Sequence, residues 1–300
     1  MPREVEPSLN EKQFFAKALN EGIRIDGRAF DEFRTLEVEF GDEFGVCDVR
    51  LGKTRIQTHI TAEVTAPFPD RPFDGLFQIT TELSPMASPH FEVNRPSETE
   101  TLLSRLLEKT LRRSGALDTE SLCLLAGQSV WSLRADVHIL SHDGNLVDCA
   151  CISVLAALQH FRKPDTSTEG EKVTVYTLRE REPVPLSLLH YPYCVTFSYY
   201  AKEGGEEGET SVLLDTTLME EQLREGNATI GINRHGEVCQ IAKLGGVPVD
   251  AVAFLGCVQV ALVKVKEISA FVTRRLEEDA KKRDKGGLMA ELSAENDRVS

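Results

Sequence analysis

Alternation of apolar and polar side chains is the dominant pattern in the first half of the chain. It runs through short segments that are rich in β-branched residues and are separated by turn-forming glycine and proline. Such alternation is typical of strands that bury one face, so the sequence predicts a sheet built from these segments. The predicted strands are residues 36–40, 46–51, 55–64, 76–83 and 131–140.

Two longer segments have helical rather than alternating spacing. The segment from Asn145 to Phe161 groups Ile152, Leu155 and Leu158 on one side. The last apolar segment, from about residue 248, repeats apolar side chains every three or four positions. Both patterns predict helices with a buried face.

The spacing of serine and glutamate marks the beginning of two further helices. Ser8 is followed by Glu11 and Ser97 by Glu100, the arrangement in which each side chain caps the backbone N–H of the other residue. We therefore expect a short helix near the N-terminus and a second helix that runs from Ser97 to about Ser114.

The second half of the chain repeats this order of elements without repeating the residues. Strands are predicted at 194–200, 211–214, 229–233 and 238–244, with a short helix near 218–224. The sequence therefore predicts an α/β (α+β) fold with two similar lobes of mixed sheets packed with helices. The expected divisions are an N-terminal helix and arm at 1–30, a first lobe at 31–165, a connecting segment at 166–188, a second lobe at 189–260, and a C-terminal helix and flexible tail at 261–300.

Composition limits the classes of partner. The chain has 300 residues, 41% of them hydrophobic, and a formal net charge of −14. This charge argues against a broad coating by nucleic acid, although it leaves room for a local basic groove. No stretch approaches the roughly eighteen apolar residues of a membrane span, and the polar N-terminus does not resemble a signal peptide. We expect an intracellular protein that does not associate with membranes.

Cysteine and histidine positions give no sign of a metal site. The seven cysteines are an odd number without a CxxC pair, which favours reduced thiols over disulfides or zinc. The seven histidines show no HExxH or comparable metal spacing. No metal and no cofactor are expected.

The turn Asp143-Gly144-Asn145 opens the predicted buried helix and raises the question of an anion site. A glycine turn at a helix N-terminus often holds phosphate, because unpaired N–H groups and the positive end of the helix dipole point outward there. With Asn145 as the N-cap, Leu146 and Val147 are the first helical positions and Asp148 is the third. Asp148 would then occupy the positive helix end, so an incoming phosphate would meet a like charge.

Several motifs in this order resemble the RNase PH family. They include RIDGR at 24–28, LGKTR at 51–55, ELSPMASPHFEVNRPSE at 82–98 and HDGNLVDCACI at 142–152. The resemblance covers roughly residues 8 to 296 and is particularly to a ring subunit of the eukaryotic RNA exosome. It implies a two-lobed RNase PH-like fold of the ribosomal protein S5 domain 2-like kind.

The resemblance also implies a missing catalytic site. Active members of the family bind phosphate with a Gly-Thr-Arg-Thr-like turn, whose Thr-Arg-Thr part falls here on Leu146, Val147 and Asp148. Of the paired acidic residues in the second lobe, Glu220 or Glu221 stands near the first position, and the second falls near residues 226–227, which carry no carboxylate. We therefore expect no catalytic residues and a degenerate phosphate site at Asn145, Leu146, Val147 and Asp148.

A basic face on the helix after Ser97 is the candidate for RNA binding. Leu103, Leu106, Leu107 and Thr110 are expected to be buried. Arg105, Lys109, Arg112 and Arg113 share another side, and composition alone explains them as a solvated face. The resemblance implies instead that arginines of this helix and of the preceding loop contact single-stranded RNA. Arg105 is the first candidate, followed by Arg95, Arg112, Arg113 and Lys109.

The resemblance finally implies partners and places. The expected partners are other RNase PH-like exosome subunits in a hetero-hexameric ring, S1/KH-type cap subunits, an associated hydrolytic nuclease and single-stranded RNA. The ring contacts are expected at exposed strand edges in 55–64 or 229–233. The expected location is the nucleus, including the nucleolus, and the cytoplasm. Two alternatives stay open, a phosphate-dependent exoribonuclease and a scaffold without RNA contact, and no role is assigned to the tail after Gly287.

Overall fold

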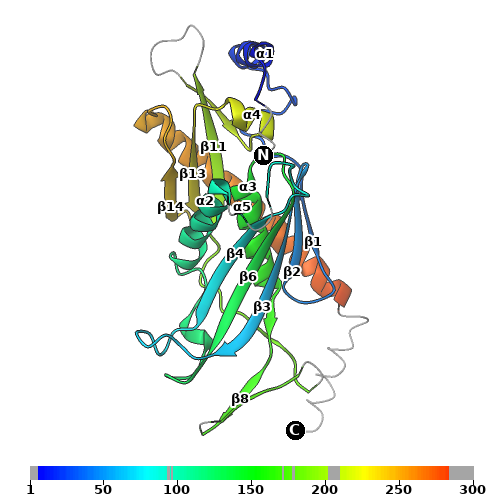
Figure 1. The fold of residues 1–300 in the computed structure, drawn as a ribbon, viewed down its shortest axis with the longest axis vertical. Helices are drawn as coiled ribbons and strands as arrows, with labels where there is room; N and C mark the ends of the chain where they lie inside the picture. The colour runs from blue at the N-terminus through cyan, green and yellow to red at the C-terminus, as the bar shows by residue number, and fades with distance from the viewer. Residues whose placement is uncertain are drawn as a thin grey trace.

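A computed structural model describes residues 6–92, 95, 97–170, 172–177, 180–201 and 210–283. Two sheets and a buried helix between them form its main body (Figure 1). The tail after Gly287, for which the sequence suggests no role, lies outside the described residues.

The first sheet confirms the predicted strands of the first lobe. Its order is β1-β2-β3-β6-β4, and all neighbours are antiparallel except β4 and β6, which are parallel. Burial alternates along β2 and most of β3, as the alternating sequence predicts. The strands are β1 (Leu36–Phe40), β2 (Val46–Leu51), β3 (Thr54–Thr65), β4 (Leu76–Leu83) and β6 (Ser129–Ser141), with the short β5 (Cys123–Leu125) beside β6.

The second sheet is antiparallel throughout, with the order β12-β11-β13-β14. The strands are β11 (Tyr193–Ala201), β12 (Thr210–Leu214), β13 (Gly226–Ile232) and β14 (Val238–Lys243), and α4 (Leu218–Leu223) connects β12 to β13. Strand β13 begins earlier than predicted, because Gly226 already pairs with Tyr199 of β11. Two small two-stranded sheets come between these sheets in chain order. They pair β7 (Arg162–Lys163) with β10 (Val184–Pro185), and β8 (Thr166–Glu169) with β9 (Lys172–Val175).

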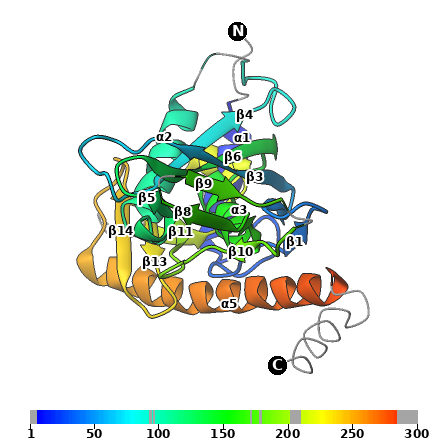
Figure 2. The same cartoon turned by 90° about the horizontal axis from the view of Figure 1, so that it is seen from below.

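Helix α3 (Leu146–His160) is the centre of the core. Its residues from Asp148 to Leu158 are all buried, and it packs against β2 and β3 on one side and β11 on the other. One hydrophobic cluster therefore runs through both lobes. The long helix α5 (Ala251–Arg283) passes along the outside of this body, as Figure 2 shows.

The remaining helices are α1 (Leu9–Asn20), α2 (Glu98–Leu107), a π-helical turn η1 (Glu108–Arg112) and a short 3-10 turn η2 (Glu120–Leu122). Ser8 and Glu11 form the predicted capping box of α1. Ser97 caps α2 through the backbone N–H of Glu100. Helix α5 runs unbroken across residue 260, so we propose that the second lobe and the C-terminal segment share it, and the other lobe boundaries stay predictions.

The two segments that were expected to form ring contacts are for the most part not sheet edges. Strand β3, which contains residues 55–64, lies between β2 and β6, and β13, which covers most of 229–233, lies between β11 and β14. Strand β13 is paired on both sides, and β3 is paired with both neighbours over residues 55–59, so these parts cannot accept a strand from another chain. Beyond residue 60, β3 pairs with β6 alone. The terminal strands of the two described sheets are β1 and β4, and β12 and β14.

The cysteines are all free thiols, as the sequence predicts, and five of the seven are buried. Burial raises the pKa of the Cys149 thiol well above its usual range. Among the described helices, none is long and apolar enough to cross a membrane.

Candidate functional site

The turn before α3 is held closed by its neighbours. Arg34 Nη1 donates to the carbonyl of Asp143 at 2.7 Å, and Thr54 Oγ1 donates to the carbonyl of Gly144 at 2.8 Å. Gly144 has a φ of +85°, and a Cβ at this position would lie 2.5 Å from the carbonyl oxygen of Thr216. Only glycine therefore lets this turn pack against the chain that leads into α4.

Asp215 is the buried anion that organises this region, and it was not among the predicted site residues. Its carboxylate accepts from Arg34 Nη2 at 2.9 Å, from Arg28 Nη1 at 3.1 Å and from Asn145 Nδ2 at 2.6 Å. Asp215 is fully buried and has a φ of +49°. Its position directly after the apolar end of β12 was the available signal, because a carboxylate there needs buried cationic partners.

The predicted capping role of Asn145 and Asp148 is wrong, although α3 does begin at Leu146. Asn145 adopts a left-handed conformation, and its side chain makes no cap hydrogen bond. Side-chain capping normally requires an extended backbone at this position. Asp148 instead accepts from the backbone N–H and the Oγ1 of Thr196, at 2.9 and 2.7 Å. From its place in the first turn, Asp148 joins α3 to β11.

Glu221 is the carboxylate that faces the turn. Its Oε1 accepts from the backbone N–H of Asn145 at 3.0 Å and from Arg224 at 3.2 Å. Burial raises the pKa of Glu221, and it raises the pKa of Asp148 to about 7. The expected carboxylate, Asp148, lies in the first turn of α3, and Glu221 of α4 adds a second one at this turn.

A cleft of about 270 Å³ adjoins the turn before α3. Leu146 and Val147 line it together with Phe91, Leu103 and Leu106, and its one lining arginine, Arg224, pairs with Glu221. His142 also lines the cleft, and burial lowers its pKa to about 4, so it is neutral at neutral pH. Apolar side chains cover the beginning of α3 in this cleft, and the lining, among the described residues, contains no lysine and no arginine free of a carboxylate, whereas an anion site needs free cations.

Glu220, the alternative to Glu221 for the first acidic position, has a structural role. It is buried and forms an ion pair with Arg24 at 2.8 Å, and it completes a capping box with Thr217 at the beginning of α4. Asn227, at the position of the missing carboxylate, lines the cleft. The described residues contain no group of three or more His, Cys, Asp or Glu side chains that could hold a metal ion.

The basic face of α2 and η1 is exposed as predicted. Leu103, Leu106, Leu107 and Thr110 are buried. The side chains of Arg105 and Arg112 are 66% and 54% exposed. Lys109 and Arg113 are exposed as well. Arg95, in the preceding loop, is 3.3 Å from Glu92.

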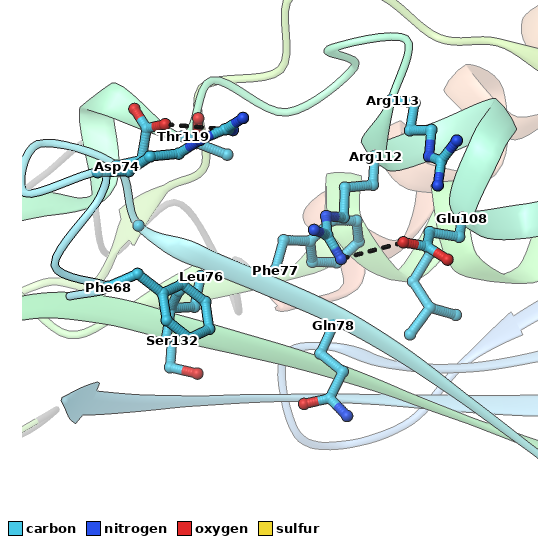
Figure 3. Close-up of a pocket in the computed structure, with 13 residues that line it drawn as sticks. Phe68, Asp74, Leu76, Phe77, Gln78, Glu108, Arg112, Arg113, Thr119 and Ser132 are labelled. Atoms are coloured by element: carbon cyan, nitrogen blue, oxygen red, sulfur yellow. Dashed lines mark hydrogen bonds and ion pairs between the residues drawn. The ribbon is translucent and has the colours of Figure 1, made fainter. Parts of the chain in front are cut away.

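Arg112 and Arg113 also line a groove of about 820 Å³ beside β4 (Figure 3). The opposite wall carries Phe68 and Gln78. Arg105 and Lys109 lie outside this lining, so the five predicted residues do not form one pocket. The sequence did not predict the π turn, in which the N–H of Arg113 donates to the carbonyl of Glu108.

Comparison with known proteins adds the family context. Residues 32–164 match domain 1 of the 3′ exoribonuclease (RNase PH) family, and residues 190–264 match its domain 2. The protein named exosome complex component rrp45 of Schizosaccharomyces pombe is 49% identical over 298 residues, covering 99% of this chain and 100% of that protein.

A second relative and a solved structure point to the same family. Exosome complex component RRP45 of Saccharomyces cerevisiae is 45% identical over 305 residues, covering 99% of each chain. A solved chain from the Archaeoglobus fulgidus exosome with RNA bound to the active site superposes with a TM-score of 0.73, at 27% identity, over 86% of this chain and 96% of that chain.

Proposed function

The chain belongs to the RNase PH-type 3′ exoribonuclease family, and on that basis we propose that it is a non-catalytic ring subunit of an RNA exosome core. Its role would be to hold the ring together and to guide single-stranded RNA through the central pore toward an associated nuclease for 3′-5′ degradation and processing. The names of its relatives support the assembly, and the cleft before α3 supports the absence of catalysis.

The single observation that carries the non-catalytic reading is the chemistry of that cleft. Phosphorolysis needs cations that hold phosphate, but Leu146 and Val147 supply only apolar surface and Glu221 supplies a carboxylate. Losing a bidentate phosphate contact and adding a like charge should cost several kcal/mol of transition-state binding, or on the order of a thousandfold in rate.

The guiding role depends on the arginine face of α2 and η1. Exposed guanidinium groups contact RNA phosphates without reading base sequence, which suits a path that must accept any transcript. Arg105, Arg112 and Arg113 would contact the backbone, with Lys109 and Arg95 beside them. Because the overall charge of −14 does not attract RNA, this local concentration of arginines is the surface where RNA would bind.

Charge reversal tests the guiding role. In an assembled ring, Arg105→Glu with Arg112→Glu should shorten the RNA segment that the ring protects from a soluble nuclease, because two cationic contacts become repulsive. The control is Arg50→Glu with Arg181→Glu, which reverses two arginines elsewhere in the chain whose side chains are 40% and 48% exposed. Unchanged protection with the first pair would favour the scaffold without RNA contact.

The ring contact needs a surface other than the expected edges. Strand β14 ends its sheet, and exposed apolar side chains gather on it and at the beginning of α5, which lies beside it in both views (Figures 1 and 2). They include Ile241 at 56% exposure and Leu255 at 62%. An apolar surface next to a terminal strand is typical of a contact between subunits, so we assign a ring contact to this face.

The finer partners and the location are proposals that follow from family membership. They are S1/KH-type cap subunits, an associated hydrolytic nuclease, and a location in the nucleus, including the nucleolus, and the cytoplasm. Fluorescence microscopy of the tagged chain tests the location, and absence from the nucleus would contradict it.

A further inference from the structure

Glu108 lies between two arginines of the basic face. Its Oε2 accepts from Arg105 Nη1 at 2.9 Å, and its Oε1 accepts from Arg112 Nη1 at 3.1 Å. The side chain of Glu108 is 20% exposed, whereas both arginines are more than half exposed. Figure 3 shows the contact with Arg112 at the wall of the groove. One carboxylate therefore connects two guanidinium groups that are seven positions apart in the chain.

The backbone around Glu108 is fixed independently of this carboxylate. Thr110 is buried and donates through Oγ1 to Gln240 of β14 at 2.7 Å, and Leu111 is fully buried. These contacts hold the π turn in place, so the carboxylate is not required to shape the chain. What it determines is the direction of the two arginine side chains. Single π turns are often found at functional sites.

We propose that Glu108 is a positioning residue for RNA, which orients Arg105 and Arg112 so that both guanidinium groups are ready to bind phosphate. This inference rests on the proposed guiding function. Each guanidinium has five N–H donors, and Glu108 takes a donor from one nitrogen of each. Long side chains lose rotamer freedom when a ligand orders them, so ordering them beforehand strengthens binding.

The opposite role for Glu108 makes an opposite prediction. If Glu108 only reduces the positive charge of this face, removing its charge should strengthen RNA binding and steepen its dependence on salt. If it positions the arginines, removing its charge should weaken binding even though the face becomes more positive. The sign of the change therefore separates the two roles.

The test compares Glu108→Gln with the native chain in the assembled ring, using a fluorescent single-stranded RNA over a series of salt concentrations. The glutamine oxygen accepts from one arginine, but its NH2 group releases the other. We expect binding weaker by roughly fivefold or more, from the freedom that the released side chain regains, without a steeper salt dependence. Equal or tighter binding would overturn the proposal.

Two variants make the result specific. Glu98→Gln, in the first turn of α2, makes the same change of charge on the same helix without breaking either ion pair, so it should leave binding unchanged or slightly tighter. Arg105→Gln with Arg112→Gln tests the guiding function itself. If that pair has no effect, the guiding function fails, whereas an effect there with none at Glu108 overturns only the positioning role.

Discussion

At the level of single residues, the region before α3 is defined by carboxylates that are buried. Asp215 is matched by Arg34 and Arg28, so it is an anion with cationic partners. Asp148 is also fully buried, but its donors are Thr196 and Asn145, which carry no charge. Burial without a cation raises the pKa of Asp148 to about 7, so its charge is costly near neutral pH.

This difference predicts a pH dependence of stability. The folded pKa of Asp148 lies above its unfolded value of 3.8, so its contribution to stability is complete below that value and is lost as pH rises toward 7. Asp148→Asn should remove that loss, because the amide can donate to Thr196 Oγ1, which lies 3.0 Å from Thr229 Oγ1. The variant should gain stability over the native chain by about 1.4 kcal/mol per pH unit between those two values.

Urea unfolding of both proteins across this pH range measures the difference. Burial lowers the pKa of His142 and of His160 to about 4, which acts in the opposite direction, but both histidines are present in both proteins and their effects cancel. A difference in unfolding free energy that does not change with pH would show that Asp148 titrates normally.

Residue patterns in the sequence predicted part of this region. The exposure of Arg105 and the apolar side chains at Leu146 and Val147 follow from helical spacing and position. The partnership of Arg34 with Asp215 could not be predicted, because it joins residues 181 positions apart. Asn145 was misjudged because its left-handed backbone depends on the packing of Gly144 against Thr216, which local sequence does not reveal.

At the level of elements, the bounds of the strands were predicted better than the order of the strands in each sheet. The bounds of β1, β2 and β4 match the alternating segments, because alternation reports which face of a strand is buried. It does not report which strand lies next to it, so β13 and the first half of β3 were mistaken for edges. The π turn after α2 was also missed, and its Thr110 contacts Gln240, which is 130 positions away in the chain.

The proposed contact at β14 and the beginning of α5 predicts which substitutions weaken ring assembly. Ile241→Asp with Leu255→Asp should reduce co-purification of the chain with its RNase PH-like neighbours, because a charge in an apolar contact loses its hydration. Val263→Asp is the matched control, since Val263 is 54% exposed but lies further along α5. Normal assembly of the double variant, or equal loss with the control, would contradict a contact at β14.

At the level of the whole molecule, the cleft before α3 and the basic face of α2 and η1 carry different chemistry. The cleft before α3 carries Leu146, Val147 and Glu221, and its one lining arginine pairs with Glu221, whereas the arginines of α2 and η1 remain exposed on the surface. We propose that a chain with these features binds an RNA backbone through its exposed arginines without holding the attacking phosphate in the cleft. The central claim is therefore that RNA contact persists without phosphorolysis.

The most direct test is release of nucleoside diphosphate from single-stranded RNA with a free 3′ end at saturating phosphate. It should be measured on the purified chain, alone and paired with an RNase PH-like ring subunit. We expect a stable pair and no release of nucleoside diphosphate. Phosphate-dependent release that disappears with Glu221→Gln, while the pair still assembles, would contradict the claim and make this chain an active phosphorolytic exoribonuclease.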